Sequence, residues 1–222
     1  MLGSTMTRSA FLRARRPEHK QQRREEILAA ARRLATESGV RNVSLGGVAS
    51  AVGLAKSNVV RYFGTREEIY LELTVEEWHG WSDEVAARLA TAAGPDDVIA
   101  ALVDTLADRT LFCDLLGHVS ITLEHNISVP AARAFKRAVH GAIDDLGARV
   151  ALAYPGLTTG EGIELAGAAA ALAGTLFPMS NPPPALRELY AQDPDIAARC
   201  LPFRPTMKRM LAALAAGLPT QR

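Results

Sequence analysis

Side chains able to bind a charged polymer gather in one short stretch, residues 43–63. From Ala55 onward the stretch has a helical pattern in which Val59 and Phe63 share one apolar face. Small, polar and basic residues at helical spacing can contact base edges in the major groove of DNA, about 12 Å wide. The opposite face carries such residues: Lys56, Ser57, Val60 and Arg61. The stretch therefore predicts DNA contact, although so short a pattern also fits ordinary helical core.

A second constellation lies on the helix predicted over residues 109–126. Asp114, His118 and His125 follow one border of its apolar face, and Thr122 lies just inside that border. Polar groups set into an apolar surface are typical of a small-molecule site, and the i, i+4 spacing of Asp114 and His118 also allows two metal ligands. A third firm ligand is lacking, so no metal site is predicted. Two histidines at a helix–solvent boundary are the simpler interpretation.

Large aromatic side chains supply further candidates for the same site. Trp78 and Trp81 lie three residues apart on a long helical pattern, and Phe177 ends a helix rich in small residues. Aromatic residues at helical spacing form core more often than a ligand cage. The ligand pocket interpretation gives the set Trp78, Trp81, Phe112, His118, Thr122, His125 and Phe177.

The elements that must position these residues are all helical. Leu45, Val48, Ala49 and Val52 form an apolar stripe that Ser44 precedes as N-cap and Gly53 ends, so residues 43–63 read as a helix-turn-helix unit. No alternating strand pattern of any length follows. We expect further helices over residues 18–38, 65–92, 96–107, 109–126, 130–154, 159–177 and 203–218. Prolines predict a long loop over 178–205, with a short helix over 184–191.

Charge divides the chain into two parts. Residues 1–66 carry 13 Lys and Arg against 4 Asp and Glu, a net of +9, whereas residues 67–222 carry 12 against 20, a net of −8. A basic head on an acidic body indicates a phosphate-binding domain joined to a different module. We expect a disordered basic tail over 1–17, a DNA-binding domain over 18–64 and a second, different module over 65–222. The tail is either a solvated segment or an arm that reaches a minor groove.

The remaining composition argues against other classes of protein. No signal peptide is recognisable, and the longest apolar run, residues 163–177, is too short and too rich in Ala and Gly to span a bilayer, so we expect a cytoplasmic location and no membrane partner. Cys113 and Cys200 lack metal-ligand spacing. The sequence holds no Gly-rich phosphate loop, GxSxG, HExxH or paired CxxC, so neither an enzyme nor a cofactor is predicted.

Residues 24–73 resemble the N-terminal DNA-binding domain of the TetR family of bacterial repressors. The likeness runs without a gap and includes Ile27, Ala30, Ala31, Leu34, Gly39, Ser44, Val48, Ala49, Gly53, Lys56, Tyr62, Phe63 and the run Glu67, Glu68 and Ile69. The resemblance implies phosphate contacts at Ser44, Asn58, Tyr62, Thr65 and Arg66. It also implies that residues 65–222 form a helical effector-binding and dimerisation domain. The resulting homodimer would bind a palindromic operator and be released by an unknown small-molecule effector.

In such a repressor the helices near 159–177 and 203–218 would pair two subunits. The density of Ala and Gly from Ile163 to Phe177 suits either that interface or a closely packed interior helix. The unit departs from the family at Gly46 and Gly47, at Ala55 and at Val60. Those departures keep a second hypothesis open, namely a helical carrier of small molecules with a weak or vestigial DNA-binding head.

Overall fold

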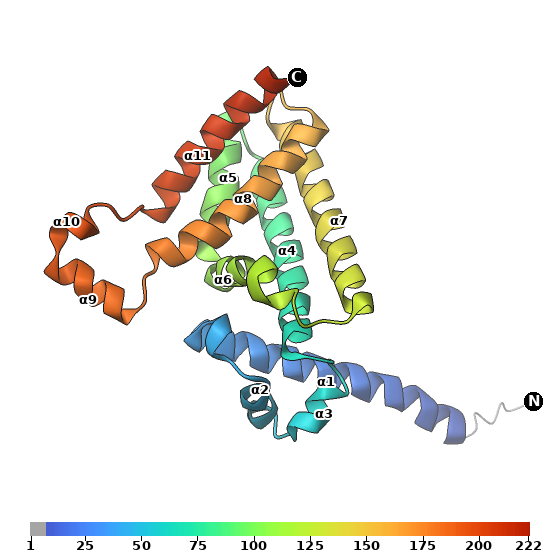
Figure 1. Cartoon of the computed structure of the whole chain (residues 1–222). Helices are drawn as coiled ribbons and strands as arrows, with labels where there is room; N and C mark the ends of the chain where they lie inside the picture. Colours follow the sequence, from blue (N-terminus) through green and yellow to red (C-terminus); the bar gives the residue numbers. More distant parts are fainter. Residues whose placement is uncertain (1–7) are drawn as a thin grey trace, which may run out of the picture.

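The computed structural model describes residues 8–222, with side chains from Glu18 onward. Over this range the chain forms helices and turns and contains no strand, which confirms the all-α prediction (Figure 1). Part of the predicted tail, residues 1–7, lies outside the described residues. The helix expected from Glu18 begins ten residues earlier, at Arg8, so residues 8–17 continue α1 (Arg8–Ser38) where we expected disorder.

The head consists of α1, the short η1 (Val40–Asn42), α2 (Leu45–Ala51) and α3 (Lys56–Val60). The Ser44 side chain caps α2 by accepting a hydrogen bond from the backbone N–H of Gly47 at 3.0 Å, and Gly53 makes the turn with φ +66°. The apolar faces expected from the sequence close onto one core, whose members include Ile27, Ala31, Val48, Ala49, Val59 and Phe63. This core fixes the angle between α2 and α3 and leaves the opposite face of α3 free.

Helix α4 (Arg66–Leu89) leads from the head into the body (Figure 1). Thr65 caps it by accepting from the backbone N–H of Glu68 at 3.2 Å, while the Glu68 carboxylate accepts from Gly64 rather than from Thr65. Thr65 and Glu68 have the spacing of a capping box, but only half of that box forms. The buried face of α4 passes from Ile69 in the head core to Trp81 in the body core, so one helix belongs to both cores.

The rest of the body packs around α4 and α8 (Figure 1). Its elements are α5 (Pro95–Asp108), α6 (Thr110–His118), the π-helical turn η2 (Val119–Leu123), α7 (Val129–Ala153), α8 (Thr159–Ser180), α11 (Phe203–Gly217) and η3 (Leu218–Gln221). The helix expected over 109–126 thus changes to π geometry at Val119. Sequence periodicity does not reveal such a turn, because the extra residue per turn depends on tertiary contacts.

Glycine pairs allow α8 to touch two neighbouring helices almost backbone to backbone. A Cβ built on Gly162 would lie 2.2 Å from the carbonyl oxygen of Gly147 on α7, and one built on Gly117 would lie 2.8 Å from that of Gly174. Within one subunit the small residues of α8 therefore serve as close interior packing, the simpler of the two interpretations. Its solvent-facing residues, such as Ala171 and Thr175, stay available for pairing.

Helix α8 is longer than the apolar run on which the prediction about membranes was based. It runs to Ser180, through Pro178, and at 22 residues is long and apolar enough by composition to cross a bilayer. The shorter run considered in the sequence did not include its last turn. In the fold, however, its buried face packs into the body core through Leu165, Ala169 and Ala173, as the central helix of a globular domain does.

Residues 181–202, here called the arm, leave the body between α8 and α11 (Figure 1). The arm contains α9 (Pro184–Gln192), close to the predicted 184–191 helix, and the single-turn α10 (Pro194–Ala197). At its base the Ser180 hydroxyl donates to the Leu201 carbonyl at 2.7 Å, and the ring of Phe177 meets that of Phe203 edge-on at 6.0 Å.

Candidate DNA interface and effector region

The predicted groove-facing residues lie on the exposed side of α3. Lys56, Ser57, Asn58 and Arg61 are exposed, and Val60 is 42% exposed although it is apolar. Val59, between them in sequence, is fully buried in the head core. The burial of one face thus presents the other as a short polar and basic edge, and an exposed valine there can pack on a thymine methyl group.

A basic recess adjoins this edge. It is a hollow of about 510 Å³ between the first helix and α3, lined by Lys20, Arg23, Leu54, Asn58, Arg61 and Tyr62. Three of the six lining residues are cations from two elements that are far apart in sequence. Such a recess suits a phosphate group, because it offers positive charge together with the amide of Asn58 and the phenol of Tyr62.

Arg66 differs from the other predicted phosphate ligands. Its guanidinium donates to the carbonyl oxygen of Val43 at 2.5 Å and to that of Val40, and it pairs with Glu67 at 3.2 Å. In this structure Arg66 therefore ties the start of α4 to the segment before α2. Ser44 and Thr65 use their hydroxyl oxygens as helix caps, and both retain an O–H that a phosphate oxygen can accept.

Arg24 joins the recognition unit to α4. Its guanidinium donates to the Tyr62 carbonyl at 2.7 Å, lies 4.0 Å from the centroid of the Phe63 ring and pairs with Glu72 on α4. Its place early in the first helix would also allow it to approach the DNA backbone, but here its guanidinium binds within the protein. Its three partners come from residues 38 to 48 positions away, a distance at which helical periodicity gives no information.

A shared carboxylate continues this connection into the body. Glu77 on α4 is nearly buried and pairs both with Arg32 of α1 and, at 3.2 Å, with Arg109 at the start of α6. Arg109 also donates to the Gly80 carbonyl at 2.8 Å and pairs with Glu84 at 3.0 Å. The head, α4 and α6 thus meet at one buried anion, which is stable there only while its cations stay in place.

Asp114 makes a direct hydrogen bond from the body to the head. Its carboxylate accepts from the backbone N–H of Val40 at 2.7 Å and lies 3.5 Å from the imidazole of His118. Close by, the hydroxyl of Tyr70 is buried without a hydrogen-bond partner in the described part of the chain, and burial raises its pKa to about 12. The predicted Asp114–His118 pair therefore exists, and one of its members anchors the head.

The predicted ligand pocket residues do not line one cavity. Trp78, Trp81 and Phe112 pack against one another, with ring centroids 5.2 to 5.8 Å apart, and the Trp81 indole donates to Thr105 at 2.8 Å. All three rings are buried in the body core. In this conformation they act as core, and contact between them and an effector stays a prediction.

The polar members of that set lie elsewhere. The Thr122 hydroxyl donates to the His118 carbonyl at 3.0 Å, and His125, exposed, lies 3.2 Å from the Ser120 carbonyl, so both belong to the π-helical turn and its end. Phe177 lies at the base of the arm. Among the described residues, no group of three or more His, Cys, Asp or Glu lies close enough together to hold a metal ion.

An apolar hollow that the sequence did not indicate opens between α4 and α7. It measures about 260 Å³ and is lined by Leu71, Val75, Ala131, Ala134, Phe135 and Ala138, with Arg24, Glu68 and Glu72 at the end nearest the head. Its walls can accommodate a small apolar molecule. The apolar lining residues lie on two different helices, α4 and α7, and no local pattern links them.

A capped helix-turn-helix unit with a basic edge, on an all-helical body, defines a DNA-binding transcription regulator. Models of two families match the chain: Bacterial regulatory proteins, tetR family, over residues 27–73, and Tetracyclin repressor-like, C-terminal domain, over residues 75–222. The second covers more than half of the chain. The chain therefore belongs to the TetR family of bacterial transcription regulators, as the resemblance indicated. No curated protein matches the chain.

Several solved structures share this fold. Thermus thermophilus FadR, a TetR-family transcriptional repressor in complex with lauroyl-CoA, is 20% identical with a TM-score of 0.51 and covers 69% of this chain and 82% of its own. A putative transcriptional regulator of Streptomyces coelicolor A3(2) is 18% identical with a TM-score of 0.53, covering 87% and 98%. RolR in complex with resorcinol is 14% identical with a TM-score of 0.52, covering 90% and 96%.

Proposed function

We propose that this regulator is a repressor that binds a palindromic operator as a homodimer and leaves it when a small-molecule effector binds the body. The observation that carries the proposal is the exposed polar edge of α3 beside the basic recess. Lys56, Ser57, Val60 and Arg61 are the proposed base contacts, and Ser44, Asn58, Tyr62 and Thr65 are proposed phosphate contacts. Lys20 and Arg23 join them from α1. Arg66 acts by holding the start of α4.

The head's construction argues against the carrier hypothesis. A vestigial head would be free to lose its cap and its core, but Ser44 caps α2 and Val59 and Phe63 are buried. The departures at Gly46 and Gly47 leave that cap in place. Ala55 provides no side-chain hydrogen bond at the start of α3, so α3 relies on its buried face for stability.

The contacts that join the body to the head support a response to ligands. A ligand acts only if it prefers the conformation that does not bind DNA, by a few kcal/mol. The Arg24–Glu72 pair, the carboxylate of Glu77 and the Asp114–Val40 hydrogen bond are the contacts that a shift of α4 relative to α6 would change. Two similar structures hold ligands as different as lauroyl-CoA and resorcinol, so they support ligand response without indicating which ligand this body takes.

Selection of bound duplexes from a random pool tests the proposal. Purified wild-type protein should enrich a palindrome, and Lys56→Ala should lose that enrichment because it removes a groove-facing cation. Arg149→Ala, which removes an exposed cation from α7 far along the body, is the matched control and should behave as the wild type.

Salt-sensitive binding to the selected palindrome separates the repressor proposal from the carrier hypothesis. With about eight phosphate contacts, the logarithm of the affinity should fall by several units per tenfold increase in salt. Failure to enrich any duplex at low salt would overturn the repressor proposal for the ligand-free protein. The body would then be screened for small-molecule binding as a carrier.

A further inference from the structure

The arm carries large apolar side chains that its own subunit does not cover. No residue of α9 or α10 is buried. In the described part of the chain, nine large apolar side chains are more than a third exposed. Three of them, Leu186, Leu189 and Ile196, lie on the arm, and Met179 lies at its base on the last turn of α8.

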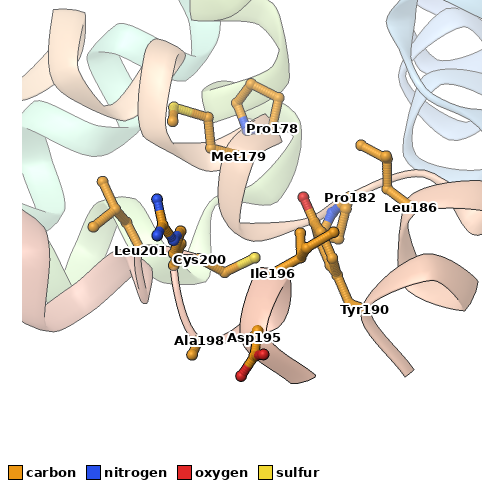
Figure 2. A pocket seen from close by; sticks show the side chains of 11 residues that line it. Pro178, Met179, Pro182, Leu186, Tyr190, Asp195, Ile196, Ala198, Cys200 and Leu201 are labelled. Atoms are coloured by element: carbon orange, nitrogen blue, oxygen red, sulfur yellow. The ribbon is translucent and has the colours of Figure 1, made fainter. Parts of the chain in front are cut away.

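Three of these side chains, Met179, Leu186 and Ile196, line a hollow of about 1000 Å³ between the end of α8 and the arm. Figure 2 shows Met179, Tyr190, Ile196 and Cys200 around the same space. The hollow is open to solvent, and Leu186 and Ile196 in its lining remain about two-fifths exposed. A small ligand is usually enclosed over most of its surface. A hollow this wide and open suits side chains from another protein surface better than a small molecule.

The helices that flank the arm, α8 and α11, expose few large apolar side chains that could anchor an interface. The solvent-facing residues of α8 are mostly small, such as Ala171 and Thr175, and on α11 the large exposed apolar side chain is Met210, among alanines such as Ala213. Interfaces gain most of their binding energy from a few large side chains near their centre. An interface made of α8 and α11 alone would have few of these.

We propose that the arm is a dimerisation element that packs against a second copy of this chain and supplies these anchors through Leu186, Leu189 and Ile196. The inference rests on the proposed homodimer. The position of the arm supports this proposal, because the arm connects α8 directly to α11, the two helices proposed to pair the subunits. The Ser180–Leu201 hydrogen bond fixes the base of the arm beside them. Helices as short as α9 are marginal in isolation, and the partner's surface stabilises them.

The test compares two triple variants by sedimentation over a range of protein concentrations. The arm variant is Leu186→Gln, Leu189→Gln and Ile196→Gln. The control replaces three exposed apolar residues outside the arm: Ile121→Gln, Val129→Gln and Leu152→Gln. The arm variant should weaken the dimer by about tenfold or more, and the control should leave its dissociation constant unchanged. Circular dichroism checks that both variants keep the helical content of the wild type.

Tryptic cleavage of the unmodified protein gives an independent readout. Arg187 and Arg199 are exposed on the arm of a single subunit. Cleavage at these sites should be slow in the dimer and should accelerate on dilution below the dissociation constant. Two results would overturn the proposal while leaving the repressor function standing. The arm variant would dimerise as the wild type does, or cleavage of the dimeric wild type would not depend on protein concentration. A wild type that stays monomeric while bound to its operator would overturn the proposed dimer itself.

Discussion

At the scale of single residues, the junction between head and body depends on a few polar side chains in uncommon surroundings. Tyr70 is the clearest, because its ring is fully buried, the Arg66 guanidinium lies 4.8 Å from the ring centroid and the hydroxyl has no hydrogen-bond partner among residues 8–222. A buried hydroxyl without a hydrogen bond destabilises a fold, since it loses its contact with water and gains nothing in return.

Removal of that hydroxyl should therefore not harm the protein. We predict that Tyr70→Phe leaves the free energy of unfolding unchanged or raises it by up to about 1 kcal/mol, measured by urea denaturation at neutral pH. Tyr70→Ala is the contrasting variant, since it leaves a large cavity and should cost about 3 kcal/mol or more. A clear loss of stability in Tyr70→Phe would mean that the hydroxyl has a partner in solution.

Glu161 gives a second prediction at this scale, in its dependence on pH. The hydrogen bonds from Arg222 and from the backbone N–H of Thr158 lower its pKa from 4.5 to about 2. A carboxyl group with a lowered folded-state pKa stabilises the fold above the unfolded pKa, and the stabilisation disappears as the pH falls through the folded value. Glu161→Gln should thus lower the melting temperature at neutral pH.

The gap between wild type and Glu161→Gln should be constant above about pH 4.5 and should close as the pH approaches 2, because the wild-type carboxylate is then protonated. Thermal denaturation at several pH values measures it. Glu164→Gln, at an exposed position of the same helix, is the control and should show a much smaller gap. A gap that does not change with pH would show that the charge of Glu161 is not what stabilises α8.

At the scale of elements, the sequence predicted the course of the chain better than the contacts between its helices. The stripe from Leu45 to Val52 and the cap at Ser44 are local features, and both confirm the helix-turn-helix unit. Trp78, Trp81 and Phe112 were predicted to share one site, but only the structure shows that they pack against one another and join α4 to α6. Whether such rings enclose a ligand or one another depends on the distance between the helices, and no local pattern specifies it.

The same limit applies to the phosphate ligands and the arm. Arg66 occupies a position that contacts phosphate in the family. Here its guanidinium donates to two carbonyl groups more than twenty residues away, and sequence spacing could not predict these hydrogen bonds. The prolines from Pro178 onward predicted a break in the chain and the short helix, but not that Met179 and Ile196 would face a common hollow.

A prediction for the elements concerns the crossing of α7 and α8. Gly162→Ala should destabilise the protein by about 1–3 kcal/mol, since the new Cβ would meet the Gly147 carbonyl and the helices must separate. Gly167→Ala, on the same helix with nothing within 4 Å of the added Cβ, is the matched control. It should be neutral or slightly stabilising, because alanine favours helix by up to about 1 kcal/mol over glycine. Equal effects of the two changes on the urea midpoint would contradict this packing.

At the scale of the whole molecule, the two cores are not independent. Leu115 and Leu123, from α6 and its π-helical turn, and Phe135 of α7 belong to the head core, while Val139 packs against both cores. The head is therefore attached to the body through packing as well as through α4 and the ion pairs of Arg24 and Arg32. Its stability should respond to changes made in the body.

The Asp114–Val40 hydrogen bond allows that coupling to be measured. Asp114→Ala should remove about 1–2 kcal/mol from the local stability of the head, since Val40 loses a charged acceptor. Amide hydrogens around η1 should then exchange about 5- to 30-fold faster, while those in the middle of α8 should be unaffected. His118→Ala, which removes only the neighbour of Asp114, should change η1 little. Equal acceleration throughout the chain would indicate global rather than local destabilisation.

The glycine contacts of α8 also limit which parts of the body can move. Close backbone contact at Gly147–Gly162 and at Gly117–Gly174 resists sliding or rotation of α8 against α7 and α6. We therefore expect these three helices to move as one group, so that a change of shape in the body is carried by α4 and α5. Asp114, on α6, connects the head to this group of helices. A tilt of α4 that carries the head with it would therefore strain the hydrogen bond between Asp114 and Val40.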